Sequence, residues 1–230
     1  IKVIPEIRHM VEVLIEDLGY DELAKPVKKP LAGMKFAGYV GCQTNRPFGI
    51  DGESFENPMY LDKLIESVGG EATKYDQKVT CCGGALAFSE PEKAQAQIKD
   101  IIEAAYDSGA EMLVTPCPLC QANTEVYQGQ INKKYGTKFN MPVLYYSQLM
   151  TLAYGGSAKA AGLPGNVIKA RKLEEFAGFL PHLESEAMAV RDPVRKQLQR
   201  IPGQHVVVTV PWTAGGFFVI GRTCPERARQ

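Results

Sequence analysis

The segment EMLVTPCPLC, Glu111 to Cys120, is the part of the chain that decides the predicted fold. Its first half, Glu111 to Thr115, is short and largely apolar, as a strand buried in a sheet is. We expect a helix to continue from the C-x-x-C segment to about Tyr135. A buried strand that passes directly into a helix is the repeating unit of α/β proteins with a parallel sheet.

The same strand–helix unit recurs before and after this segment. Two further strands are predicted from apolar runs over 35–40 and 142–146, and residues 72–80 are a plausible third strand. Each is followed by a predicted helix, over 58–68, 148–153 and 91–108 respectively. The alternation predicts an α/β fold, a parallel sheet with flanking helices, over 31–170.

Two flanking regions do not continue this alternation. Residues 1–30 hold a predicted amphipathic helix over 5–18 and a linker. Residues 171–230 form an irregular C-terminal extension with no assigned role, in which a helix over 174–199 and a strand over 206–210 are expected. We expect both regions to supply packing or docking surface.

Composition argues against several classes of protein. The 26 basic and 26 acidic residues balance, so no strong field favours nucleic acid or an anionic membrane. The longest apolar run, 206–220, is interrupted by proline and glycine, and no transmembrane segment is predicted. The N-terminus has no secretory signal, so a cytoplasmic location is expected. Because the chain begins at Ile1, we expect it to be a fragment or a processed product.

Five of the six cysteines follow the predicted strands. They form a single cysteine, an adjacent pair and a C-x-x-C pair within one 79-residue stretch: Cys42, Cys81, Cys82, Cys117 and Cys120. The carboxyl ends of parallel strands share the edge of a sheet where ligands bind, so we expect the fold to gather these thiols into one site. Such uneven grouping indicates metal or redox chemistry rather than structural disulfides.

Five thiols narrow the choice of what this site holds. Structural zinc takes four ligands, often from paired C-x-x-C knuckles, so zinc is the second choice. A cubic [4Fe–4S] cluster also takes four cysteines, and a fifth thiolate implies an opened or extended cluster or a free redox thiol beside it. A metal-free alternative is a thiol–disulfide motif at Cys117 and Cys120, which leaves the other three cysteines unexplained.

The position of other residues relative to the five cysteines decides which of them we expect to belong to the site. Gly83 and Gly84 directly follow Cys82, where they would let the backbone approach a bulky group and donate N–H bonds to sulfur; a simple turn is the alternative. Cys224 lies over a hundred residues further on and is predicted to be a thiol that binds no metal. The histidines have no ligand spacing with the cysteines: His9, His182 and His205.

The residues around the cysteines resemble the cysteine-rich CCG domain of the B-type subunits of heterodisulfide reductase. The resemblance covers about 11–170 and is carried by RPFGIDGESFENPMYLDKLIE (46–66), TCCGGALAFSEPEKA (80–94), GAEMLVTPCPLCQAN (109–123) and MPVLYYSQLMTLAYG (141–155). The segments CPLCQAN and MPVLYYSQL resemble this branch of the family more than the glycolate and lactate iron–sulfur subunits that share the domain.

The resemblance implies a Rossmann-like CCG domain that holds one noncubane [4Fe–4S] cluster. It implies five cysteine ligands and two adjoining glycines: Cys42, Cys81, Cys82, Cys117, Cys120, Gly83 and Gly84. The resemblance implies that these cysteines correspond to the second of two modules in the family, and we expect the first module to be missing from this chain. The tail after about Phe176 has no counterpart in the family.

The implied function is that of an oxidoreductase subunit in a larger complex. A cluster iron would cleave or form a disulfide or sulfur-carrier substrate by one-electron steps, in methane or sulfur metabolism. The implied partners are iron–sulfur C-type and flavin A-type subunits of a heterodisulfide-reductase-like complex. The alternatives are an electron-relay subunit of a glycolate or lactate oxidase type of complex, and a zinc-stabilised interaction module.

Overall fold

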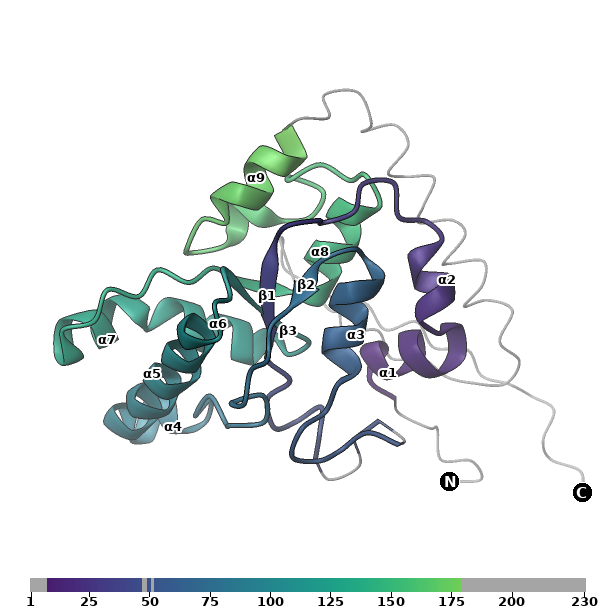
Figure 1. Cartoon of the computed structure of the whole chain (residues 1–230). Helices are drawn as coiled ribbons and strands as arrows, with labels where there is room; N and C mark the ends of the chain where they lie inside the picture. The colour runs from purple at the N-terminus through teal and green to yellow at the C-terminus, as the bar shows by residue number, and fades with distance from the viewer. Residues whose placement is uncertain (1–7, 47–48, 51, 179–230) are drawn as a thin grey trace, which may run out of the picture.

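A computed structural model of the chain describes residues 8–46, 49–50 and 52–178. At its centre four parallel strands lie side by side in the order β2-β1-β3-β4. Their bounds are β1 Lys35–Gly38, β2 Glu71–Ala72, β3 Met112–Thr115 and β4 Val143–Tyr145. The predicted α/β fold, a parallel sheet with flanking helices, is confirmed (Figure 1).

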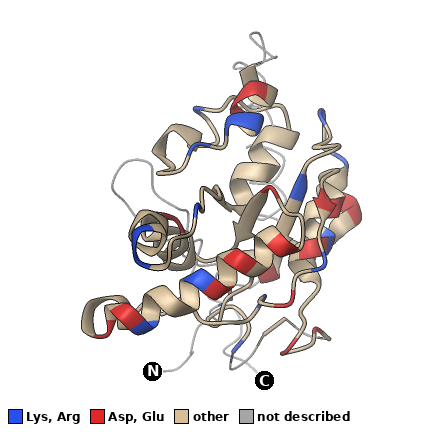
Figure 2. Ribbon diagram, turned by 60° about the vertical axis from the view of Figure 1, so that its left-hand side comes forward, with Lys and Arg blue, Asp and Glu red and all other residues tan. Residues whose placement is uncertain are grey.

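Helices cover both faces of this sheet. One face carries α1 Met10–Val13, α2 Tyr20–Ala24, α3 Tyr60–Ser67, α8 Tyr146–Ala153 and α9 Arg171–Gly178. The other face carries α5 Pro91–Asp107, α6 Pro118–Val126 and α7 Gln128–Tyr135, and the short α4, Leu86–Ser89, packs against α5. Charged side chains of both signs are spread along the helices, α5 among them (Figure 2).

Successive strand residues point to opposite faces, and each face has its own hydrophobic core. Phe36 of β1 and Val114 of β3 pack into the core with α3 and α8. Their chain neighbours Ala37 and Leu113 pack into the core with α5 and α7. Strands covered on both sides need apolar residues at every position, which is why these segments read as continuous apolar runs.

The N-terminal helix predicted over 5–18 is confirmed from Met10 onward, whereas Arg8 and His9 precede it in non-helical backbone. Helix α1 begins at Met10 and continues into a π-helix, Leu14–Leu18. Arg8 holds this segment together, since its guanidinium forms ion pairs with three carboxylates of the following turns, those of Glu12, Glu16 and Asp17.

Two predicted elements are wrong in extent. The strand expected over 72–80 ends at Ala72, because Tyr75 turns into the core and its hydroxyl donates to the carbonyl of Ile101 at 3.1 Å. The single helix expected to continue from the C-x-x-C segment to about Tyr135 is divided into α6 and α7. Gln128 stabilises the division, since its side-chain amide donates to the carbonyls of Thr124 at 2.9 Å and Met141 at 2.8 Å.

The helix predicted over 174–199 begins earlier, at Arg171, and its described part ends at Gly178. Leu173 and Ala177 of this helix, α9, are buried in the same core as α3 and α8. The rest of that prediction, and the strand expected over 206–210, lie outside the described residues. Within 8–46, 49–50 and 52–178, no helix has the length and apolar character needed to cross a membrane.

Candidate metal centre

The five cysteines of the predicted site all lie beyond the carboxyl ends of the strands. The strands run downward in Figure 1, so the connections that carry the cysteines lie at the bottom of that view. Cys42 follows β1, Cys81 and Cys82 lie between β2 and α4, Cys117 is the N-cap of α6 and Cys120 is in its first turn. All five are free thiols; three are buried and the other two, Cys42 and Cys81, are partly exposed.

One contact between sulfur atoms, and the effects of the thiols on one another's pKa, group the five side chains. The Sγ atoms of Cys42 and Cys81 are 3.8 Å apart. The thiol of Cys120 shares hydrogen bonds with those of Cys82 and Cys117. Cys82 also raises the pKa of Cys42, and a Cβ on Gly41, directly before Cys42, would lie 2.8 Å from the Sγ of Cys120, so the pair lies beside the group of three. The structure thus brings the five residues together, while their role as ligands stays a prediction.

The thiols differ in their tendency to ionise. The hydrogen bond from Cys120 lowers the pKa of Cys117 to about 6, and the backbone amides of Cys120 and Leu119 at the start of α6 act in the same direction. The same thiol lowers the pKa of Cys82, whereas the Cys120 pKa is raised well above its usual range. Burial raises the pKa of Cys42. Since thiolates bind metals, Cys82 and Cys117 are the thiols best prepared for coordination.

Glycines let the backbone pass close to these sulfur atoms. Gly83 has a φ of +66° and its N–H lies 3.3 Å from the Sγ of Cys81, as a donor. A Cβ on Gly84 would lie 3.8 Å from the Sγ of Cys82, so both predicted glycines adjoin the thiols. The sequence prediction missed a third glycine, Gly41. Its φ is +73°, and a Cβ there would lie 2.8 Å from the Sγ of Cys120.

Two polar side chains beside the thiols were also missed. The amide of Asn123 donates to the carbonyl of Cys82 at 3.1 Å and lies 3.9 Å from its Sγ. Asn123 lies one turn after Cys120 on α6, which is the signal that the sequence offered. Tyr39 is fully buried, and its hydroxyl donates to the carbonyl of Thr80 at 2.6 Å.

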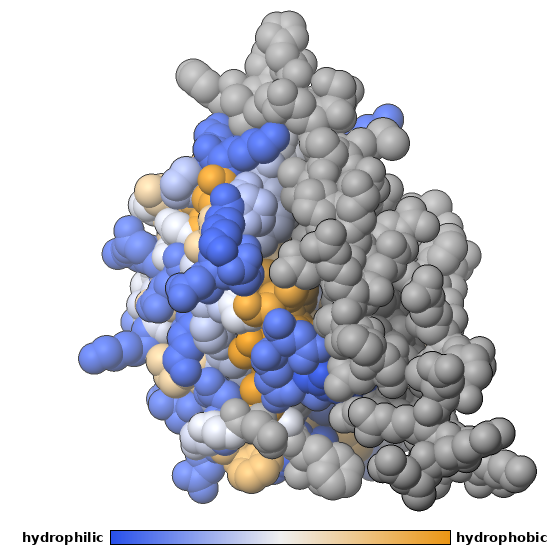
Figure 3. Space-filling view, turned by 90° about the vertical axis from the view of Figure 1, so that its right-hand side faces the viewer, coloured by the Kyte–Doolittle hydropathy of each residue, from blue (hydrophilic) through white to orange (hydrophobic). Residues whose placement is uncertain are grey.

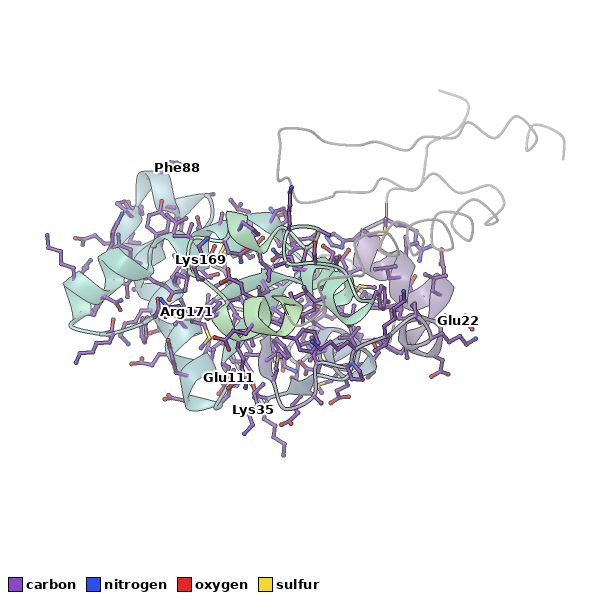
Figure 4. The ribbon with its side chains drawn as sticks, turned by 90° about the horizontal axis from the view of Figure 1, so that it is seen from above. Glu22, Lys35, Phe88, Glu111, Lys169 and Arg171 are labelled. Atoms are coloured by element: carbon purple, nitrogen blue, oxygen red, sulfur yellow. The ribbon has the colours of Figure 1, made fainter. Side chains whose placement is uncertain are left out.

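The segments that carry the cysteines also expose large apolar side chains. They are Phe55, Met59, Phe88 and Leu119. Phe88, on α4, is 89% exposed and lies at the periphery in Figure 4. A Cβ on Gly84 would meet the Cδ2 of Leu119 at 2.6 Å, so Leu119 closes over the backbone beside Cys82. The surface next to the thiols is therefore apolar in part.

The histidines and Cys224 are not among the described residues of this site. The imidazole of His9 accepts the backbone N–H of Val11 at 3.3 Å and caps α1. His182, His205 and Cys224 lie outside the described residues. Among the described side chains, no three histidines, cysteines or acidic residues are arranged to hold a single metal ion as they stand.

Comparison with known proteins connects this site to a sequence family. The sequence model of the cysteine-rich CCG domain matches residues 36–124, which include all five cysteines. One solved structure, of a hypothetical protein from Helicobacter pylori, aligns with a TM-score of 0.50 at 14% identity. It covers 66% of this chain and 28% of that protein, and it supports the fold alone.

Curated relatives extend beyond that domain. The chain is 37% identical over 169 residues to the 8-methylmenaquinol:fumarate reductase membrane anchor subunit of Wolinella succinogenes, covering 73% of this chain and 59% of the relative. It is 32% identical over 168 residues to the B-type subunit of the ferredoxin/F(420)H(2)-dependent CoB-CoM heterodisulfide reductase of Methanosarcina acetivorans, covering 71% and 55%. The B-type subunit of the ferredoxin:CoB-CoM heterodisulfide reductase of Methanosarcina mazei matches at 30%, with the same coverage. The chain spans little more than half the length of these relatives.

Proposed function

We propose that this chain, which matches the CCG domain over 36–124 and is similar to B-type subunits of heterodisulfide reductases, is an iron–sulfur subunit of a reductase complex. Its cluster ligands are the five cysteines at one sheet edge: Cys42, Cys81, Cys82, Cys117 and Cys120. The observation that carries this proposal is the convergence of five free thiols from three connections that are distant in sequence.

The residues present fit an iron–sulfur cluster. Thiolates are the ligands that such clusters take, and five exceed the four that structural zinc or a cubic cluster uses. Gly41 and Gly83 leave room for backbone close to the sulfurs, and the amide of Gly83 already donates to one of them. We therefore propose the noncubane [4Fe–4S] type, with zinc as the second choice. When bound, the cluster would supply one-electron transfer and an iron able to take a sulfur ligand.

The chain's own residues prepare this site in three ways. Cys82 and Cys117 are held toward the thiolate form by the hydrogen bonds described above. Burial of Cys82, Cys117 and Cys120 excludes water from one side. The partly exposed pair, Cys42 and Cys81, leaves the other side open, and a substrate or partner would approach there.

The reaction that we propose is reduction or formation of a disulfide, or transfer of a sulfur from a carrier, as part of a multisubunit oxidoreductase. Support comes from the relatives named as subunits of heterodisulfide reductases. The proposed partners are an iron–sulfur C-type and a flavin A-type subunit, in the cytoplasm. Methane or sulfur metabolism would supply the substrate.

A second candidate function is electron relay without contact with a disulfide. The 37% identity to a subunit of a fumarate reductase supports it, because that relative's name assigns it to a reductase of another substrate. In this case the same five cysteines would hold a cluster that only accepts and passes on electrons. Glycolate and lactate oxidase types of complex remain examples of this class.

One experiment separates the two functions. The chain, loaded with iron and sulfide under anaerobic conditions, is titrated with a small organic disulfide or thiol while electron paramagnetic resonance spectra are recorded. A cluster that reacts with disulfides should change its spectrum in a saturable way, because a sulfur from the ligand enters the coordination sphere. A spectrum that is insensitive to both reagents would contradict disulfide chemistry and favour the relay.

A further inference from the structure

A buried ion pair lies behind the connection that carries two of the cysteines. Lys78 precedes Cys81 by three residues, and its ammonium contacts the carboxylate of Asp62 in the first turn of α3. Both side chains are only 3% exposed. The same ammonium lies 3.4 Å from the carbonyl of Pro58 and 3.2 Å from the Sδ of Met59, so it is held by the N-terminal end of α3.

The backbone of Lys78 makes a second connection. Its carbonyl accepts the N–H of Gly41 at 2.8 Å, and Gly41 directly precedes Cys42. Two residues further on, the carbonyl of Thr80 accepts the hydroxyl of Tyr39. Lys78 is therefore the point where α3, the loop after β1 and the loop of the adjacent cysteines meet.

Stability alone gives no reason for charges at this place. Desolvating two ions is costly, and apolar residues of similar volume often stabilise a protein equally well or better. The Oδ1 atom of Asp62 has no hydrogen-bond partner, and a Cβ on Gly38 would collide with it. An ion pair kept under these conditions has its best-attested use in fixing how segments align.

We propose that the Lys78–Asp62 pair positions the loop of Cys81 and Cys82 against Cys42. The pair anchors the loop to α3, and the carbonyl of Lys78 sets its distance from the loop after β1. Lys78 and Asp62 are thus positioning residues for the half of the site outside the C-x-x-C turn. The inference rests on the proposed function for its biological meaning, but the alignment itself belongs to the metal-free chain.

Disulfide trapping in the metal-free chain measures this alignment directly. The reduced protein is treated with diamide, which takes two electrons and two protons from each pair of thiols, and the products are mapped by mass spectrometry after quenching. The rate of Cys42–Cys81 disulfide formation reports the position of the Cys81–Cys82 loop relative to Cys42, because the two Sγ atoms are 3.8 Å apart in the structure. The Cys117–Cys120 bond is the internal control, because both residues lie in one turn.

Lys78→Met should slow formation of the Cys42–Cys81 disulfide about tenfold or more, since the two thiols lose their high effective concentration. The Cys117–Cys120 rate should change less than about twofold, because its geometry is local. Lys172→Met is the matched control. It removes an ion pair of 2.7 Å with Glu111, which lies beside Lys35 at the amino ends of the strands, and it should alter neither rate (Figure 4).

The double variant Lys78→Met with Asp62→Leu separates positioning from stability. It leaves no unpaired charge, so its thermal unfolding midpoint should be higher than that of Lys78→Met alone. The rate of Cys42–Cys81 disulfide formation should stay as low as in Lys78→Met. The proposal would be overturned if the Cys42–Cys81 disulfide formed in this variant at the wild-type rate. It would also be overturned if the rates of both disulfides changed equally. A selective loss in a chain that takes up no iron would support it and would contradict the proposed function.

Discussion

Replacing Gly41 by alanine tests how closely the backbone must approach the sulfur site. Alanine at a φ of +73° costs about 1–2 kcal/mol, because its Cβ crowds the neighbouring carbonyl. The new Cβ would also lie 2.8 Å from the Sγ of Cys120, whereas ordinary contacts begin at 3.4 Å, so the sulfur must move by about 0.6 Å. Metal–ligand distances tolerate only about 0.2 Å, so we expect loss or change of the cluster.

Gly33 offers a matched control for this substitution. Its φ is +74°, but a Cβ there meets nothing within 4 Å. Gly33→Ala should therefore cost a similar backbone strain of about 1–2 kcal/mol and leave the cluster unchanged. Both variants are compared by denaturant unfolding of the metal-free chain, and by iron content and electron paramagnetic resonance after loading.

The comparison has two results that would refute the reasoning. Gly41→Ala could load with the iron content and spectrum of the wild type, which would mean that Cys120 is no ligand or that the site absorbs the displacement. Alternatively, Gly33→Ala could lose as much iron as Gly41→Ala, which would mean that strain anywhere in the fold disturbs the site.

Three further predictions follow from the site and from the surface. Serine at any of the five cysteines should alter the cluster spectrum, and one variant of the adjacent pair, Cys81 or Cys82, should give a converted four-cysteine cluster. Cys224→Ser should leave the spectrum unchanged. A serine substitution among the five that does not change the spectrum would contradict the ligand assignment. In the metal-free chain, alkylation of Cys117 should follow its pKa of about 6, fast above that pH and slow below it, and a midpoint at the usual thiol value near 8.5 would contradict the hydrogen bond from Cys120. The isolated chain should self-associate or require other subunits, because large apolar side chains such as Phe55, Phe88 and Val126 are exposed and a narrow band of apolar residues is visible in Figure 3. A monomer at high concentration in sedimentation would count against this.

The positions of the cysteines could be predicted because they depend on local patterns. Three of the four predicted strands lead into a connection that carries a cysteine or a pair of them, and the carboxyl ends of parallel strands share one edge of the sheet. The alternation of strand and helix therefore placed Cys42, Cys82 and Cys117 near one another without any knowledge of side-chain contacts.

The extents of some elements could not be predicted, because tertiary contacts decide them. The run after Ala72 has a plausible strand composition, yet Tyr75 gains a buried hydrogen bond by leaving the sheet. The amide of Gln128 bonds to Met141, thirteen residues away, and this contact accompanies the division between α6 and α7. A single sequence carries no local signal for either contact.

The supporting residues of the site depend on distant pairs in the same way. Lys78 and Asp62 are sixteen residues apart, and each alone reads as an ordinary surface charge. Gly41 could have been found from its place directly before Cys42, but only its positive φ and its distance from Cys120 give it a role.

Metal analysis of the anaerobically purified chain tests the central claim most directly. Iron, zinc and acid-labile sulfide are measured per chain on freshly isolated protein. We expect a brown protein with about four irons and labile sulfide, because the five thiolates are proposed to hold one [4Fe–4S] cluster. Stoichiometric zinc without labile sulfide would contradict this assignment.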